Sequence, residues 1–178
     1  AVMTPAEVGE TTVEANGVTF PCLTAGSGPL ALCLHGFPDT PHSWRHLMVD
    51  LARAGYRAVA PFQRGYAPTT VPADGRYQSG VLSVDANALH EALGGDGSAV
   101  LIGHDWGAAA AHGAAVLEPH RWRRVVTMAV PPGPVFVTAV LGNRAQLKRS
   151  WYMFFFQSPL ADLVVPADDL AFIDMLWA

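Results

Sequence analysis

The chain has 178 residues, of which 51% are hydrophobic, enough to bury the core of one domain of ordinary size. Its formal net charge is −4 and its eleven Lys and Arg residues are scattered, so no basic surface for nucleic acid is expected. No apolar run reaches the roughly 18 residues of a membrane span, and two cysteines are too few for a disulfide framework, which fits a reducing, cytoplasmic compartment.

The N-terminal part predicts a hairpin, a buried strand and a helix. Residues 11–15 and 18–23 alternate polar and apolar side chains around Asn16-Gly17, a dipeptide typical of a two-residue hairpin turn. Residues 30–34 are all apolar, as in a central strand that is buried on both faces. After a loop, Thr40 is a suitable N-cap for the helix that follows.

Strands and helices then alternate. Residues 56–61, 100–102 and 124–130 are short apolar runs that predict strands, and residues 82–93 and 108–117 have the spacing or composition of helices. Such alternation is typical of an α/β fold, with an open, mostly parallel sheet and helices on both of its faces.

The pattern of apolar and polar residues changes near residue 133. Three apolar segments between residues 135 and 177 have no strand signal, and the last has Asp168 or Asp169 as a candidate N-cap. We therefore expect residues 1–132 to form an α/β core and residues 133–178 to begin a helical domain over the sheet edge. The aromatic run at residues 151–156 predicts the core of this helical domain, the lining of an apolar pocket, or both.

The stretch Gly103-His104-Asp105-Trp106-Gly107 lies between a predicted buried strand and an alanine-rich helix. This pattern is typical of a nucleophile elbow, a sharp turn that lifts one side chain above the edge of the sheet. The usual nucleophile at the centre is serine, whereas this chain has Asp105. The alternative interpretation is an ordinary turn at the end of a strand.

An aspartate in this place favours a particular chemistry. A carboxylate that attacks an sp3 carbon forms an ester, and water can attack the ester carbonyl while nearby N–H groups stabilise the oxyanion. A serine would form an ether, which water does not readily remove. The residue type therefore points to epoxide opening or halide displacement, and away from a lipase or a peptidase.

The loop His35-Gly36-Phe37-Pro38-Asp39 follows the central strand, where its backbone amides can point above the sheet. The amide of Phe37 is the first candidate oxyanion donor, and the amide of Trp106 is the second. The alternative is a simple tight connection in which His35 is a structural histidine. His112, on the alanine-rich helix, is expected to be a packing or surface residue.

Four stretches in this order resemble the α/β-hydrolase-fold epoxide hydrolases. They are His35-Gly36-Phe37-Pro38, Arg64-Gly65-Tyr66, Gly103-His104-Asp105-Trp106-Gly107 and Trp151-Tyr152-Met153-Phe154-Phe155-Phe156-Gln157. The resemblance implies an α/β-hydrolase fold whose helical region, residues 133–178, is the start of a cap domain.

The resemblance also implies roles for individual residues. Asp105 would be the nucleophile, with Phe37 and Trp106 supplying the oxyanion hole, and Tyr152 would protonate the epoxide oxygen. The side chains expected to contact a small apolar epoxide are His35, Trp106, Trp151, Phe155 and Phe156. No cofactor, metal or nucleic acid is implied. Whether the protein forms a homodimer is left open.

The chain also departs from the pattern of this family. The family needs a late histidine that activates water and an acid that orients it, but all seven histidines here precede the expected position. A second cap tyrosine and the C-terminal strands of the sheet are absent as well. We therefore expect this chain to be the N-terminal part of a longer enzyme, which by itself could form the ester and stall.

Two other functions stay open. A haloalkane dehalogenase would use the same ester, but those enzymes usually have Asn where this chain has Phe37, whose side chain cannot donate to a halide. Fluoroacetate dehalogenases have Arg in the place of Trp106. A non-catalytic α/β-hydrolase relative is the other alternative, since the base and its acid partner are not found.

Overall fold

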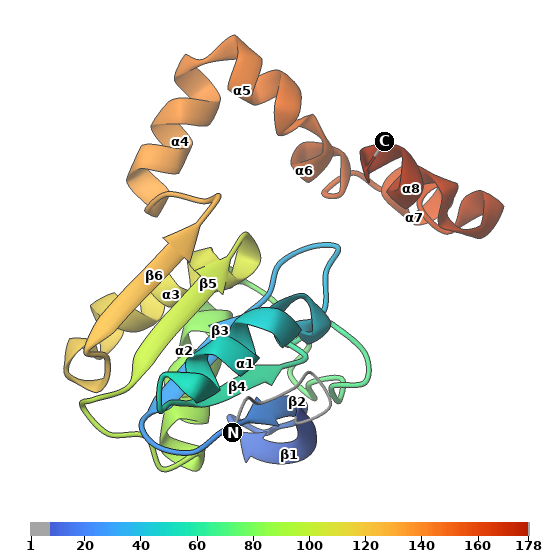
Figure 1. The fold of residues 1–178 in the computed structure, drawn as a ribbon. Helices are drawn as coiled ribbons and strands as arrows, with labels where there is room; N and C mark the ends of the chain where they lie inside the picture. The colour runs from blue at the N-terminus through green and yellow to red at the C-terminus, as the bar shows by residue number, and fades with distance from the viewer. Residues whose placement is uncertain (1–7, 178) are drawn as a thin grey trace. The chain divides into compact units, whose positions relative to one another are not determined.

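The computed structural model describes residues 8–177 and divides into two compact units, Ala1–Pro132 and Gly133–Ala178. The first unit contains a six-stranded sheet, and the second is helical (Figure 1).

The sheet of the first unit is mixed and mostly parallel, with the strand order β1-β2-β4-β3-β5-β6. The strands β1 and β2 pair with each other, and β2 with β4, in antiparallel fashion, whereas β3, β4, β5 and β6 are joined by parallel pairs. Their bounds are β1 Gly9–Ala15, β2 Val18–Ala25, β3 Leu30–Leu34, β4 Arg57–Pro61, β5 Val100–His104 and β6 Arg124–Met128. The predicted fold class is confirmed.

The hairpin β1–β2 turns at Asn16-Gly17, as the sequence predicted. Both residues have positive φ, 47° and 71°, which a two-residue turn of this twist requires. The next strand of the chain, β3, lies between β4 and β5, and all five of its residues are buried. This position explains why residues 30–34 are continuously apolar.

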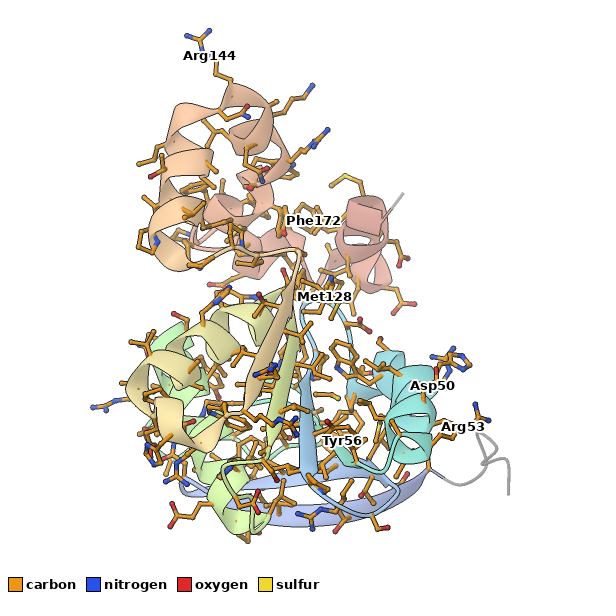
Figure 2. The ribbon with its side chains drawn as sticks, turned by 60° about the vertical axis from the view of Figure 1, so that its left-hand side comes forward. Asp50, Arg53, Tyr56, Met128, Arg144 and Phe172 are labelled. Atoms are coloured by element: carbon orange, nitrogen blue, oxygen red, sulfur yellow. The ribbon has the colours of Figure 1, made fainter. Side chains whose placement is uncertain are left out.

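Helices cover both faces of this sheet (Figure 1). On one face α1 (Arg45–Arg53) packs through Met48 on a cluster that includes Ile102. On the other face α2 (Ser79–Ala92) and α3 (Trp106–Leu117) pack on the larger core cluster around Leu32 and Leu101. The outer side of α1 is polar, and Asp50 and Arg53 form an exposed ion pair of 3.1 Å there (Figure 2).

Two local expectations need correction. The helix after the His35 loop begins as a 3-10 turn, Pro41–Trp44, and the Thr40 side chain does not cap it. One residue earlier, Asp39 Oδ1 accepts the backbone N–H of Thr40 (2.8 Å) and the side-chain hydroxyl of Ser43. The strand expected over residues 124–130 ends at Met128, because Ala129 has φ 70° and leaves the extended conformation.

The second unit consists of short helices, as expected. They are α4 Gly133–Gly142, α5 Arg144–Arg149, α6 Trp151–Phe155, α7 Ala161–Val164, a 3-10 turn Ala167–Leu170 and α8 Ala171–Trp177. Neither Asp168 nor Asp169 is the N-cap of α8, because both have left-handed φ (49° and 55°) and lie inside the 3-10 turn. Within residues 8–177, no helix is long and apolar enough to cross a membrane.

Candidate active site

Asp105 lies at the junction of β5 and α3, in a conformation that few non-glycine residues adopt. Its φ is 52° and its ψ is −118°. A residue held in such a region costs about 1–3 kcal/mol and persists only where its surroundings enforce it. Here the Asp105 carbonyl accepts the N–H groups of Ala108 (2.9 Å) and Ala109 (3.1 Å), so the first turn of α3 enforces the elbow.

Three glycines make room for this elbow. A Cβ on Gly103 would lie 2.2 Å from the carbonyl oxygen of Gly107, and a Cβ on Gly107 would lie 2.0 Å from that of Leu34. A Cβ on Gly36 would lie 2.3 Å from the Cβ of Asp105. No side chain fits at these positions, so the Gly-x-Asp-x-Gly pattern and the glycine of the His35 loop serve the same close packing.

The Asp105 carboxylate is held by the loop that follows β3. The backbone N–H of Phe37 donates to Asp105 Oδ1 at 2.8 Å, across 68 positions of sequence. In the part of the chain that the structure describes, no Lys or Arg forms an ion pair with this carboxylate. A partly buried carboxylate with one backbone donor and no cationic partner has an oxygen left for chemistry.

The second expected amide belongs to Trp106, which is the first residue of α3. The first four N–H groups of a helix have no carbonyl partner within the helix, so this amide is a suitable donor for an oxyanion next to Asp105. The Trp106 side chain is 40% exposed. The structure therefore brings Phe37, Trp106 and Asp105 to the same sheet edge.

His35 is almost completely buried, with 1% of its surface exposed. Its Nε2 accepts the backbone N–H of Gln63 (3.2 Å), so its Nδ1 carries the proton and donates to the carbonyl of Gly36 (2.9 Å). Burial lowers the pKa of this imidazole, although the Gly36 hydrogen bond and the charges of Asp39 and Asp105 oppose the shift. Because both ring nitrogens are occupied, this geometry favours a structural histidine over the expected substrate contact.

Two residues of the loop after β4 support His35, and the sequence assigned no role to either. The Gln63 side-chain amide donates to the His35 carbonyl, and the Tyr66 ring packs edge-on against the imidazole, with 4.6 Å between centroids. Burial, together with the negative charges of Asp105 and Asp39, raises the pKa of Tyr66. Its hydroxyl is therefore neutral at physiological pH. No local pattern marks Gln63, because its partner is 28 residues away.

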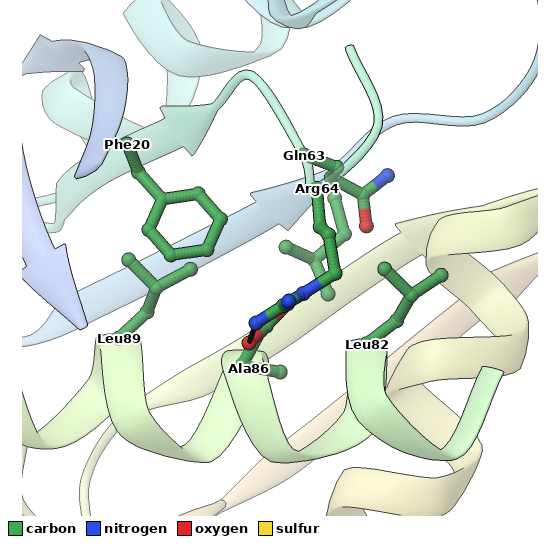
Figure 3. Close-up of a pocket in the computed structure, with 8 residues that line it drawn as sticks. Phe20, Gln63, Arg64, Leu82, Ala86 and Leu89 are labelled. Atoms are coloured by element: carbon green, nitrogen blue, oxygen red, sulfur yellow. Dashed lines mark hydrogen bonds and ion pairs between the residues drawn. The ribbon is translucent and has the colours of Figure 1, made fainter. Parts of the chain in front are cut away.

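A buried ion pair anchors the same loop. The Arg64 guanidinium donates to Asp85 of α2 through Nε (2.6 Å) and through a terminal nitrogen (2.8 Å). Asn16 of the hairpin turn also donates to Asp85 (2.6 Å). Figure 3 shows Arg64 extending toward α2 beside a small cavity, between Leu82 and Leu89. The hydrogen bond with Asp85 raises the pKa of Arg64, so the guanidinium keeps its positive charge.

The remaining predicted residues belong to the second unit, where α6 carries Trp151, Tyr152 and Phe155. The rings of Trp151 and Phe155 lie 5.9 Å apart, and those of Tyr152 and Phe156 lie 6.0 Å apart. Phe172 of α8, which the sequence did not single out, stacks on Phe155 at 4.9 Å. The aromatic run thus forms a cluster of its own within this unit.

Among residues 8–177, no three His, Cys, Asp or Glu side chains are placed to hold a metal ion. Cys22 and Cys33 are free and buried, and burial raises the pKa of each thiol to about 12. They are neutral at physiological pH and are not candidate nucleophiles.

Comparison with known proteins agrees with this geometry. A sequence profile of the family described as alpha/beta hydrolase fold matches residues 29–164. The chain belongs to the α/β hydrolase fold family.

Several relatives of this α/β hydrolase are named epoxide hydrolases. One from Caballeronia sordidicola is 42% identical over 125 residues, which cover 70% of this chain and 38% of that protein. Epoxide hydrolase A of Mycobacterium tuberculosis is 35% identical over 165 residues, which cover 89% of this chain and 51% of that one. The chain thus spans about half the length, or less, of these curated relatives.

A solved structure of an epoxide hydrolase is similar to this chain as well. The crystal structure of the Bacillus megaterium epoxide hydrolase in complex with an inhibitor superposes with a TM-score of 0.85 at 30% identity. The match covers 93% of this chain and 58% of that one.

Proposed function

We propose that this α/β hydrolase opens epoxides to vicinal diols through an ester between the substrate and Asp105. The observation that carries the proposal is the 2.8 Å hydrogen bond from the Phe37 amide to Asp105 Oδ1, at an elbow whose glycines leave no room for side chains. The similarity to proteins named epoxide hydrolases supports the choice of substrate class.

In the first step, Asp105 Oδ2 attacks an epoxide carbon. The carbon–oxygen bond of the ring breaks, its electron pair stays on the oxygen, and that oxygen takes a proton from the Tyr152 hydroxyl. An acid is needed because an alkoxide is a poor leaving group, and a tyrosine with its ordinary pKa near 10 holds its proton at neutral pH. The Phe37 amide keeps Oδ1 out of this attack, so Oδ2 is the nucleophile.

In the second step, water attacks the ester carbonyl carbon. The carbonyl oxygen is then Oδ1, which already accepts the Phe37 N–H, and the negative charge that develops on it is stabilised by Phe37 and Trp106. The bond from this carbon to the substrate-bound oxygen breaks and the diol leaves. The two protons of the water end on the departing alkoxide and on the Tyr152 phenolate, and Asp105 is regenerated as a carboxylate. A base must activate the water, and we assign this role to no histidine described above: His35 has both ring nitrogens occupied.

We propose that the second unit is the cap of this enzyme and that its aromatic cluster binds the organic part of the substrate. Apolar ring faces are offered by Trp151, Phe155 and Phe156. Tyr152 lies on α6 together with Trp151 and Phe155, and Phe156 follows directly after this helix. An apolar epoxide with an aromatic substituent, such as styrene oxide, fits this lining.

The test is a single turnover of the complete protein with styrene oxide in water labelled with ¹⁸O, with enzyme in excess. The ester mechanism predicts an unlabelled diol and label in the Asp105 peptide, because the diol oxygen comes from the carboxylate. Direct attack of water on the epoxide would put the label in the diol and contradict the proposal. The variant Asp105→Ala should form neither ester nor diol.

Two further measurements separate the two alternatives. Chloride release from a chloroalkane in the absence of diol formation from epoxides would indicate a dehalogenase. Binding of styrene oxide without an adduct, and unchanged binding by Asp105→Ala, would indicate a non-catalytic relative.

A further inference from the structure

A single carbonyl next to the elbow accepts two hydrogen bonds. It belongs to Met128, the last residue of β6, which is labelled in Figure 2. The backbone N–H of Asp105 donates to it at 3.2 Å, and the N–H of Val130 donates at 2.9 Å. The amide of the proposed nucleophile is therefore held by a carbonyl whose own direction depends on the turn that follows β6.

This turn is strained. The hydrogen bond from Val130 to Met128 closes three residues, and the central one, Ala129, has φ 70°. Three-residue turns with positive φ are rare and strained, and Ala129 has a Cβ that disfavours this conformation. The Met128 carbonyl thus links two non-glycine residues with positive φ: it accepts the N–H of Asp105, and it closes the turn whose central residue is Ala129.

The two residues after the turn, Pro131 and Pro132, have no backbone N–H to donate to it. A side chain of α3 holds it instead. His112 Nε2 lies 3.1 Å from the carbonyl oxygen of Val130, and since a carbonyl only accepts, the imidazole donates through Nε2–H. His112 is partly buried and takes no part in the proposed reaction.

These contacts close a ring. α3 begins immediately after Asp105 and carries His112. His112 holds Val130, Val130 closes the turn on Met128, and Met128 accepts the N–H of Asp105. Strained conformations persist only where their surroundings over-determine them, and in this ring the His112 side chain supplies the only contact that does not come from the backbone.

We propose that His112 is a positioning residue for Asp105. By holding the Val130 carbonyl it keeps the strained turn at Ala129 closed, and so it keeps the Met128 carbonyl on the amide of the elbow. The consequence for turnover rests on the proposed function, whereas the consequence for the Asp105 amide does not.

The test compares three variants of the complete protein. His112→Leu removes the donor, His112→Gln keeps an N–H donor at a similar distance from the backbone, and His120→Leu makes the same change at an exposed histidine. Amide hydrogen exchange is measured by NMR at Asp105 and Val130, together with kcat and KM for styrene oxide.

We expect faster exchange at Asp105 and Val130 in His112→Leu, and about a tenfold lower kcat with KM within about twofold, since small displacements of a reacting group are costly. His112→Gln should restore both readouts, and His120→Leu should leave both unchanged. In His112→Leu combined with Ala129→Gly, exchange at Asp105 should slow again, because glycine takes positive φ without strain.

Unchanged exchange at Asp105 in His112→Leu would overturn the inference, whatever the activity. Equal acceleration throughout β5 would also overturn it, because His112 would then act only on global stability. If exchange responds as expected but the unmodified protein forms no ester, the positioning role stands and the proposed function fails.

Discussion

The two residues with opposite roles in the proposed reaction, Asp105 and Tyr152, lie in regions that are built differently. Asp105 follows a strand whose residues are almost all buried, and backbone hydrogen bonds together with three glycines determine its position. Tyr152 lies on α6, a helix of five residues of which none is buried, and its neighbours are aromatic rings about 6 Å away.

This difference extends through both units. In the first unit two core clusters sandwich the sheet, whereas the described helices of the second unit bury few side chains and leave Val135, Leu141 and Leu163 exposed. Backbone contacts position a side chain more narrowly than ring contacts on a short helix do. We therefore expect substitutions around Asp105 to change both the stability of the fold and the rate of turnover, and the substitution at Tyr152 to be seen in the rate of turnover.

The largest effect is expected at Asp105 itself. Asp105→Ala and Asp105→Gly should both lower turnover by about 10⁴-fold or more, since each removes the nucleophile. They should differ in stability, because glycine adopts φ 52° freely, and the Gly variant should be more stable than the Ala variant by about 1 kcal/mol. Chemical denaturation measures this, and equal stabilities would show that the elbow is not strained.

The buried ion pair tests how firmly the first unit holds the loops of its site. Arg64→Met leaves Asp85 buried and unpaired, and should lower the free energy of unfolding by about 3–5 kcal/mol. Arg64→Met with Asp85→Leu should recover most of the loss. Arg53→Met, at an exposed pair, should change stability by less than about 1 kcal/mol in urea unfolding, and a similar loss there would contradict the assignment.

Tyr152→Phe tests the second region. It removes the hydroxyl and keeps the ring, so kcat for styrene oxide should fall by about 10²-fold with a similar KM. Tyr77→Phe, the same change at an exposed tyrosine, is the matched control. An unaltered kcat in Tyr152→Phe would leave the proposed first step without its acid.

The smallest expected effect is a change in stability with pH, which arises from His35 in the first unit. Burial lowers the pKa of His35, so the unfolded chain binds its proton near pH 6.5 while the folded chain does not. Stability should therefore fall as the pH drops below 6.5 and level off below the lowered pKa of His35. His35→Asn should be less stable but should lose this component of the pH dependence, which urea unfolding at several pH values would detect.

Several features of the fold were predictable because they depend on local chemistry. Asn16-Gly17 adopts the two positive φ values that the hairpin needs, and the apolar run of β3 corresponds to a strand buried on both sides. The early end of β6 at Ala129 was not predictable, because alanine has no preference for positive φ and only the contacts around Met128 hold it there.

The candidate site divides in the same way. The glycines around Asp105 identify the elbow, and the chemistry of a carboxylate indicates an ester, so the sequence by itself determined which residue to examine. The tertiary structure decided what surrounds that residue. Phe37 contacts Asp105, Gln63 contacts His35, and His112 contacts Val130, and the two residues of each pair are far apart in sequence. Hydrophobic periodicity and turn preferences act over a few residues, whereas these contacts exist only because parallel strands bring their carboxyl ends to one edge of the sheet.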